Sequence, residues 1–173
     1  AADLSDRYVS QYGDWVGGVV SSIVPLERSP NLSKSASEVH RPGTIGVSFE
    51  SDSFTTLELL VHEASHQRFF ILERAREVKR PDDSQRYYSP LPDAMRTIDR
   101  VILAYHACVN IVRCYEDLEQ NGAPIRWRGT EKQRRFMRRV SLMEETLEHD
   151  CHLSDVGLAF VHELRRFSRE RSS

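Results

Sequence analysis

The residues in this chain whose types and spacing could do chemistry form an HExxH motif, His62-Glu63-Ala64-Ser65-His66, inside an apolar stretch. On a helix, residues four positions apart lie on one face about a turn apart, so the imidazoles of His62 and His66 can reach one metal ion. Glu63 lies close to the same face, where its carboxylate can act on a metal-bound water or tune a ligand. The short pattern also arises by chance as two surface histidines beside a solvated glutamate, so the rest of the chain must decide between these interpretations.

A catalytic metal site usually has three protein ligands, and the motif supplies two histidines. Among the remaining histidines, His106 stands out because it lies between Ile102 and Val109 on the apolar face of a later helical pattern. A buried imidazole needs a partner, which can be a metal shared with the motif or a backbone carbonyl. The cluster His149-Asp150-Cys151-His152 is a weaker metal candidate, because turn and capping roles at a helix end suffice to explain it.

The composition predicts a soluble protein with one metal-binding catalytic domain over residues 1–173. Hydrophobic and charged residues make up 39% and 29% of the chain, which is ordinary for a protein with a packed core. The formal net charge of −2 argues against nucleic acid as a partner, and no apolar run approaches the roughly 18 residues of a membrane span. Three cysteines without a CxxC motif favour a reducing compartment, so we expect a cytoplasmic protein. The chain begins at Ala1 without a methionine, which leaves a longer parent protein open.

The hydrophobic periodicity predicts a mainly α-helical bundle. The expected helices cover residues 4–27, 55–78, 95–120, 130–149 and 155–169. The expected loops cover residues 28–44, 79–94 and 123–129. Ile45 and Val47 alternate with small residues, which predicts a short strand before the HExxH helix. Thr55 and Glu58 are spaced as a capping box, which predicts that this helix starts near Thr55.

Three segments, taken in order, resemble a known family. They are residues 60–66 with the HExxH motif, residues 87–93 with Tyr-Tyr-Ser-Pro-Leu followed by an aspartate, and residues 104–107 with Ala-Tyr-His-Ala. This order resembles the HExxH peptide-modification family, whose members accompany the biosynthesis of ribosomal peptide natural products. Those proteins are similar to iron(II)- and 2-oxoglutarate-dependent β-hydroxylases of peptide side chains. The resemblance covers about residues 44–118, with a looser match at 153–157.

The resemblance implies the roles of individual residues. His62, His66 and His106 would be the iron ligands, and Glu63 would be a catalytic residue beside them. The family's arginine after the Ser-Pro segment corresponds to Arg96, which is implied to bind a carboxylate of 2-oxoglutarate. A guanidinium suits this task because it can donate two parallel hydrogen bonds to one carboxylate.

Two departures from the family pattern leave Arg100 as a rival for the cosubstrate anchor. The family often has Trp-Arg after Ser-Pro, where this chain has Leu91-Pro92. The family's Arg-Pro corresponds to Arg96 followed by Thr97, and Arg96 lies ten residues before His106, a longer spacing than we expect. Arg100 lies only six residues before that histidine, on the first turns of the same expected helix.

We therefore expect an iron(II)- and 2-oxoglutarate-dependent oxygenase that hydroxylates a C–H bond, on the β-carbon of a side chain. Its substrate would be a peptide or an amino-acid derivative, free or bound to a carrier or leader. A zinc hydrolase is the first alternative, with Glu63 as general base on a zinc-bound water. The usual third ligand of such enzymes is a glutamate on a following helix, and Glu116 fits poorly because it lies about 80° around the helix from His106. A non-catalytic helical interaction domain is the second alternative.

Overall fold

The computed structural model describes residues 8–27, 33–50, 52–80, 84–123, 127–148 and 152–169. Along the chain the elements are α2 (Ser10–Gly17), β1 (Ser22–Pro25), β2 (Ser35–Ser37), β3 (Thr44–Val47), α3 (Ser53–Ala75), β4 (Tyr87–Ser89), β5 (Ala94–Arg96), α4 (Ile98–Gln120), α5 (Trp127–Glu148) and α6 (Asp155–Arg169). The prediction of a mainly helical single domain with a small β element before the HExxH helix is confirmed. No helix in the described ranges is both long and apolar enough to cross a membrane.

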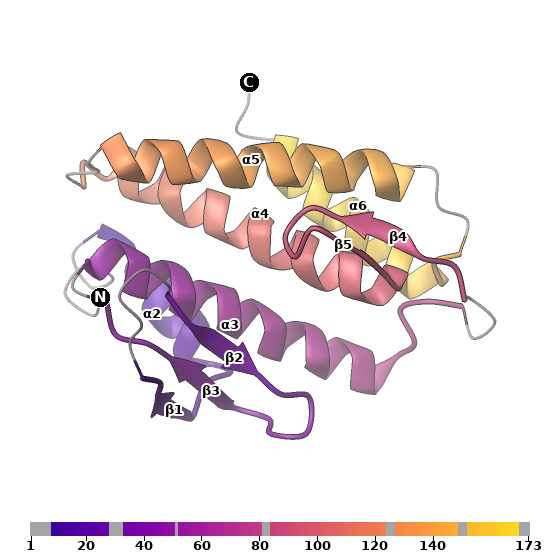
Figure 1. Cartoon of the computed structure of the whole chain (residues 1–173), viewed down its shortest axis with the longest axis horizontal. Coiled ribbons are helices and arrows are strands. Elements are labelled where there is room, and N and C mark those ends of the chain that lie inside the picture. The colour runs from indigo at the N-terminus through magenta and orange to yellow at the C-terminus, as the bar shows by residue number, and fades with distance from the viewer. Residues whose placement is uncertain are drawn as a thin grey trace.

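The helices α3, α4 and α5 form the centre of the molecule and run in alternating directions (Figure 1). α4 lies between the other two and packs against both. The apolar residues that recur at helical spacing meet in this core, where Val61, Phe69, Ile102 and Tyr105 are fully buried. The HExxH motif on α3 and His106 on α4 therefore belong to neighbouring helices, as their apolar stripes predict.

The start of α3 differs from its prediction by two residues. Asp52 precedes the helix, and its carboxylate accepts hydrogen bonds from the backbone N–H groups of Phe54 and Thr55. The predicted capping box at Thr55 is therefore wrong: Thr55 lies inside the helix and donates its hydroxyl to the same aspartate at 2.7 Å. The aspartate is the better cap because one carboxylate satisfies two free backbone donors of the first turn.

The helix predicted over residues 4–27 is wrong beyond Gly17. The chain leaves the helix there, and β1 pairs in parallel with β3, while β2 pairs antiparallel with the other edge of β3. β2 lies within the segment expected to be a loop. Ile45 and Val47 of β3 are buried with Leu59 of α3, so the small sheet covers one side of the HExxH helix. Pairing with β3 settles the structure of β1, and that partner lies some twenty residues away in the sequence.

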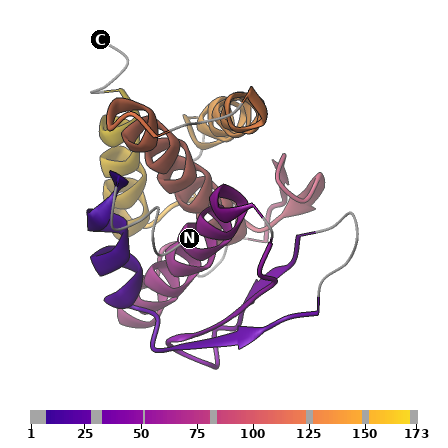
Figure 2. The same ribbon diagram turned by 90° about the vertical axis from the view of Figure 1, so that its left-hand side faces the viewer.

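The segment expected as a long loop over residues 79–94 contains β4 and the turn that leads to β5. These two strands pair as an antiparallel hairpin, separate from the three-stranded sheet (Figure 2). At its turn Asp93 has a positive φ of 50°, and its carboxylate accepts a hydrogen bond of 2.8 Å from the Tyr88 hydroxyl. β4 contacts both α4 and α5, so the hairpin lies against the helices that surround the HExxH motif.

The last three helices follow their predictions with shifted starts. α4 starts at Ile98 rather than near residue 95, because β5 occupies the preceding residues. α5 starts at Trp127, earlier than the predicted start at residue 130, and α6 matches the prediction. α6 packs against α4, and just before it Ser154 donates its hydroxyl to the carbonyl of Glu77, in the segment that follows α3, at 2.6 Å. Phe160 of α6 packs against the core, with its ring 6.0 Å from the Phe69 ring.

Candidate metal centre

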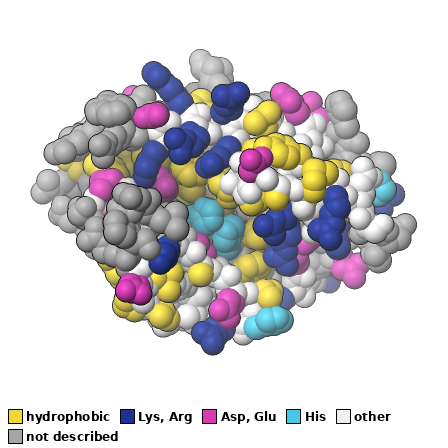
Figure 3. Space-filling view, viewed as in Figure 1, with side chains coloured by type: hydrophobic (Ala, Val, Ile, Leu, Met, Phe, Trp, Pro, Cys, Tyr) yellow, Lys and Arg dark blue, Asp and Glu magenta, His cyan; other side chains and the backbone are white. Residues whose placement is uncertain are grey.

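The HExxH motif lies in the middle of α3, the helix that packs against α4. On the face viewed in Figure 3, histidine side chains lie in a hollow near the centre, with lysine and arginine side chains above it and to its right. His62 is half-buried, with 19% of its side chain exposed, whereas Glu63 is 2% exposed. The motif is therefore neither a solvated surface pair nor sealed in the core, and a small molecule can reach it.

His62, Glu63 and His66 form a compact group of ligand atoms. One ligand atom of each lies within 4.8 Å of the others, and the two imidazole rings are 4.4 Å apart at an angle of 76°. The distance from His62 Nε2 to Glu63 Oε1 is 3.9 Å. Ligand atoms bound to one metal at about 2.0–2.1 Å are roughly 3.4 Å apart in tetrahedral geometry, so small side-chain movements would suffice for binding.

The surroundings favour neutral imidazoles at this place. Burial lowers the pKa of His62, against the opposing effect of the neighbouring Glu63 carboxylate. Burial also lowers the pKa of His66 well below its usual value, and the neighbouring His62 adds to this shift. A neutral imidazole has the free lone pair that a metal requires, so these histidines do not have to lose a proton at neutral pH before they bind one.

Three buried polar atoms here have no hydrogen-bond partner within the described residues. They are His66 Nδ1, His106 Nδ1 and Glu63 Oε2. Buried polar atoms without partners are costly, and native structures contain few of them. A divalent cation beside the motif would compensate for part of this cost, and imidazole nitrogen with carboxylate oxygen is a donor set that suits iron(II) and zinc. The residues present therefore fit a metal ion.

His106 does not belong to the compact group that His62, Glu63 and His66 form. It lies on α4, buried, with its ring 5.1 Å from the Phe160 ring at an angle of 70°. Burial lowers its pKa to about 4, although a hydrogen bond with the backbone of Ser65 opposes the shift. Its Nδ1 has no hydrogen-bond partner within the described residues, so neither of the two roles that the sequence leaves open is established, and its role as third ligand stays a prediction.

A cavity of about 260 Å³ lies beside His66. Its walls come from α3, from the hairpin and from the first turns of α4, and its lining residues are His66, Ser89, Leu91, Pro92, Arg96, Arg100, Leu103 and Ala104. Both arginines that the sequence suggests for the cosubstrate line this cavity. The hairpin and α4 therefore place two guanidinium groups on the walls of the cavity that one histidine of the motif also lines.

The two arginines differ in their contacts. Arg100 Nε lies 3.3 Å from a carboxylate oxygen of Asp99, and the other oxygen of Asp99 lies 3.8 Å from Lys79 Nζ. Arg96 is exposed, and its guanidinium has no hydrogen bond or ion pair within the described part of the chain. Arg100 therefore belongs to a local ion network, whereas the charge of Arg96 is available to a ligand.

Ser89 is a cavity residue to which the sequence assigns no role. Its side chain is 0% exposed, and its hydroxyl has no hydrogen-bond partner within the described residues. The sequence contains Ser89 in the Tyr-Tyr-Ser-Pro segment of the family resemblance, which is the signal that could have drawn attention to it. Burial of a single hydroxyl depends on tertiary structure, so no periodicity could have revealed it.

The second metal candidate of the sequence is not tested. His149, Asp150 and Cys151 lie outside the described residues, and only His152 of that cluster is described.

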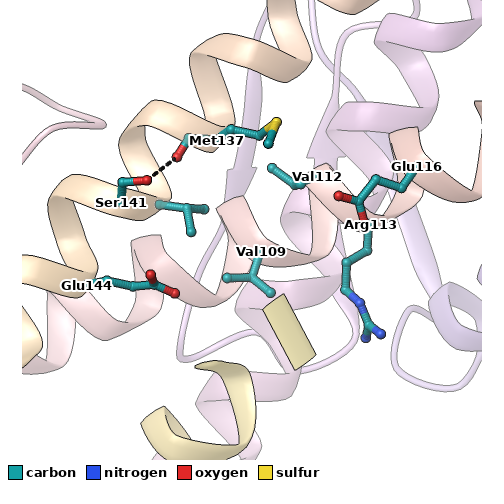
Figure 4. A pocket seen from close by; sticks show the side chains of 8 residues that line it. Val109, Val112, Arg113, Glu116, Met137, Ser141 and Glu144 are labelled. Atoms are coloured by element: carbon teal, nitrogen blue, oxygen red, sulfur yellow. Dashed lines mark hydrogen bonds between the residues drawn. The ribbon is translucent and has the colours of Figure 1, made fainter. Parts of the chain in front are cut away.

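Another cavity, of about 150 Å³, lies between α4 and α5 (Figure 4). Among its lining residues Ser141 donates its hydroxyl to the carbonyl of Met137 at 3.2 Å, and the Glu144 carboxylate accepts a hydrogen bond of 2.7 Å from Tyr105. Much of the remaining wall is apolar, with Val109, Val112 and Val140. Among the described residues that line this cavity there is no histidine or cysteine.

No family model matches the chain, and no curated protein matches it either. The assignment of a function therefore rests on the histidine group, on the cavity beside it and on the order of the three sequence segments.

Proposed function

We propose that this protein is an iron(II)- and 2-oxoglutarate-dependent oxygenase that hydroxylates a C–H bond in a peptide or amino-acid-derived substrate. The observation on which the proposal depends is that His66, Arg96 and Arg100 line one cavity. A 2-oxo dicarboxylic acid has a chelating end for a metal and a second carboxylate for a cation. The cavity offers a metal-binding imidazole and two guanidinium groups on its walls, as such a ligand requires.

His62 and His66 would hold the iron, with either His106 or Glu63 as the third protein ligand. Two histidines and a carboxylate are a common ligand set of oxygen-activating iron(II), and three histidines are the set that the family resemblance implies. When bound, iron(II) and 2-oxoglutarate supply the oxidising chemistry, in which O2 oxidises the cosubstrate to succinate and CO2 and one oxygen atom enters the substrate C–H bond.

The chain itself binds and orients these groups. The guanidinium of Arg96 or Arg100 would bind the distal carboxylate of the cosubstrate through charge-assisted hydrogen bonds. Leu91, Pro92 and Leu103 form apolar walls that would contact the methylene groups and limit the entry of water.

A zinc-dependent hydrolase is the second candidate, and one observation favours it. The Glu63 carboxylate lies within the compact group with both motif histidines, and its Oε2 has no partner within the described residues. A general base that activates a metal-bound water would occupy such a position. This candidate gives no role to the two arginines beside His66, which is why we place it second.

The test combines metal identification with cosubstrate turnover. The protein is purified without oxygen, its metal is measured, and succinate is quantified after addition of 2-oxoglutarate, O2 and candidate peptides. We expect bound iron and iron-dependent formation of succinate. Peptide cleavage by the zinc-loaded protein, without consumption of 2-oxoglutarate under any condition, would replace the oxygenase by the hydrolase.

A further inference from the structure

Ser89 pays an energetic cost in this fold that no described residue compensates. A buried hydroxyl without a hydrogen bond loses its contact with water and gains nothing in return. The same side chain lines the cavity beside His66, together with Arg96 and Arg100. The position of Ser89 therefore suggests that a ligand in this cavity accepts a hydrogen bond from its hydroxyl. The neighbouring arginines indicate that this ligand is an anion.

The register of the hairpin places Ser89 and Arg96 on one face. Ser89 pairs with Ala94, and Tyr87 pairs with Arg96, so all four side chains point to the same side of the hairpin. Tyr88 and Met95 point to the other side, where they are 45% and 56% exposed. Ser89 and Arg96 are diagonal neighbours across the two strands, a relation in which Cα atoms lie about 7–8 Å apart. A hydroxyl and a long guanidinium side chain at that spacing can donate to the same carboxylate.

The opposite wall offers a weaker donor. Arg100 is already within 3.3 Å of Asp99, a carboxylate with a side chain that is only 10% exposed. A ligand carboxylate at Arg100 would have to share this cation with Asp99. Arg96 has no such competitor within the described residues, so the hairpin wall attracts an additional carboxylate more strongly than the α4 wall does.

We infer that Ser89 and Arg96 together bind the distal carboxylate of the 2-oxo acid, and that Arg100 keeps Asp99 as its partner. The hydroxyl of Ser89 donates one hydrogen bond, and the guanidinium donates the others. The identity of the ligand rests on the proposed function, whereas the pairing of Ser89 with Arg96 rests on the hairpin register and the buried hydroxyl. Ser89 is then a residue that selects dicarboxylic over monocarboxylic 2-oxo acids.

The first measurement is ligand binding to the iron(II)-loaded protein without oxygen, by titration calorimetry. The two probes are 2-oxoglutarate and 2-oxopentanoate, which has a methyl group in place of the distal carboxylate. We expect Ser89→Ala to weaken 2-oxoglutarate about tenfold and to leave 2-oxopentanoate unchanged, because only the former can accept the lost hydrogen bond. A purely structural role of Ser89 would weaken both ligands equally, and that result would overturn the inference.

The second measurement is thermal unfolding of the ligand-free protein. Ser89→Ala should unfold at or above the wild-type temperature, because it removes a buried hydroxyl that has no partner within the described residues. Ser48→Ala is the matched control. Ser48 is also fully buried, but its hydroxyl accepts from the Lys34 backbone and donates to Glu50, both at 2.8 Å. The control should unfold at a lower temperature and keep the wild-type preference for 2-oxoglutarate.

The third measurement combines Ser89→Ala with Arg96→Leu. If both side chains bind one carboxylate, Ser89→Ala should weaken 2-oxoglutarate much less in the Arg96→Leu background than in the wild type, because the carboxylate has already lost its main anchor. If the two substitutions weakened 2-oxoglutarate binding independently, so that their effects on the binding free energy added up, the proposal of a shared site would be overturned. Equal binding of the two probes by the wild type would overturn the inference and leave the oxygenase standing. Absence of binding of any 2-oxo acid would overturn both proposals.

Discussion

The cavity beside His66 and the cavity between α4 and α5 both lie against α4, but their polar groups have different partners. Between α4 and α5, Ser141 donates to the Met137 carbonyl (Figure 4), and Glu144 accepts from Tyr105. Arg113 also lines this cavity and has an interaction partner, although its buried Nε makes no hydrogen bond within the described residues. Beside His66, the buried hydroxyl of Ser89 and the buried Nδ1 of His66 have no hydrogen-bond partner within the described residues, and the exposed guanidinium of Arg96 has none either. Because folding normally satisfies its buried polar groups, unsatisfied ones that converge on a cavity indicate a ligand site. Cavity volume alone does not separate the two.

The comparison also explains why the α4–α5 cavity is a poor candidate for catalysis. Its apolar wall is formed by valines of both helices, which meet where two packed helices leave a gap. A gap of this kind follows from imperfect packing and requires no ligand. The cavity beside His66, by contrast, brings together residues from α3, α4 and the hairpin, three segments that are far apart in the sequence.

The largest expected effect is loss of the metal from the site beside the His66 cavity. His66→Ala removes one of the two motif imidazoles, so bound metal should fall to background, as measured by elemental analysis after dialysis. The fold should persist, because the variant also removes a buried Nδ1 without a described partner. Ser141→Ala, in the other cavity, is the control and should keep the metal. Metal retention in His66→Ala would remove the HExxH motif from the site.

The next effect separates the two candidates for the third ligand. Loss of a ligand should weaken metal binding by more than the about 10–100-fold that is typical of residues that only orient a ligand. We expect this from His106→Ala, with Glu63→Gln weakening the metal less. Metal affinity and thermal unfolding are measured together. If His106→Ala lowers the unfolding temperature and leaves the metal in place, His106 has only a structural role in the core, and Glu63 becomes the third ligand.

A smaller effect distinguishes the two arginines. Arg96→Leu should raise the 2-oxoglutarate concentration needed for half-maximal succinate formation by roughly 10- to 100-fold, because charge-assisted hydrogen bonds are lost. Iron binding should remain. Arg100→Leu should have a weaker effect on the cosubstrate but lower the stability by about 1 kcal/mol, because Asp99 then has Lys79 as its remaining cation. The reverse ranking would make Arg100 the anchor.

The sequence predicts the parts of this molecule that depend on local patterns. The apolar spacing around His62 and His106 identifies α3 and α4, and the alternation at Ile45 and Val47 identifies β3. It fails at β1, because the apolar residues before Pro25 fit a helix as well as a strand, and the choice depends on distant pairing with β3. The sequence also does not predict the hairpin, because each of its strands has only three residues, with prolines nearby, and so short a segment shows no hydrophobic periodicity.

The candidate site divides in the same way. His62 and His66 are predicted from one motif, and Arg96 and Arg100 follow from their order along the chain. Ser89 is different, because its burial and lack of a partner exist only when the hairpin folds against α4. The distinction between Arg96 and Arg100 also depends on the structure, since the sequence does not show which of the two arginines forms an ion pair with Asp99.

The smallest expected effect comes from filling the α4–α5 cavity. Val109→Ile adds one methylene group to a wall of that cavity, and burial of a methylene contributes about 0.8 kcal/mol at most, so we expect a gain of about 0.5 kcal/mol in unfolding free energy. Metal and 2-oxoglutarate binding should not change, because no group proposed to bind either of them lines this cavity. Ala104→Val is the matched variant on the other side: it adds bulk beside His66, and should weaken 2-oxoglutarate while the metal stays bound. Denaturant unfolding measures the stability of both variants, and ligand titration measures their affinity for 2-oxoglutarate. If Val109→Ile weakened 2-oxoglutarate as much as Ala104→Val, the α4–α5 cavity would take part in binding, and satisfied polar groups would no longer distinguish a packing gap from a site.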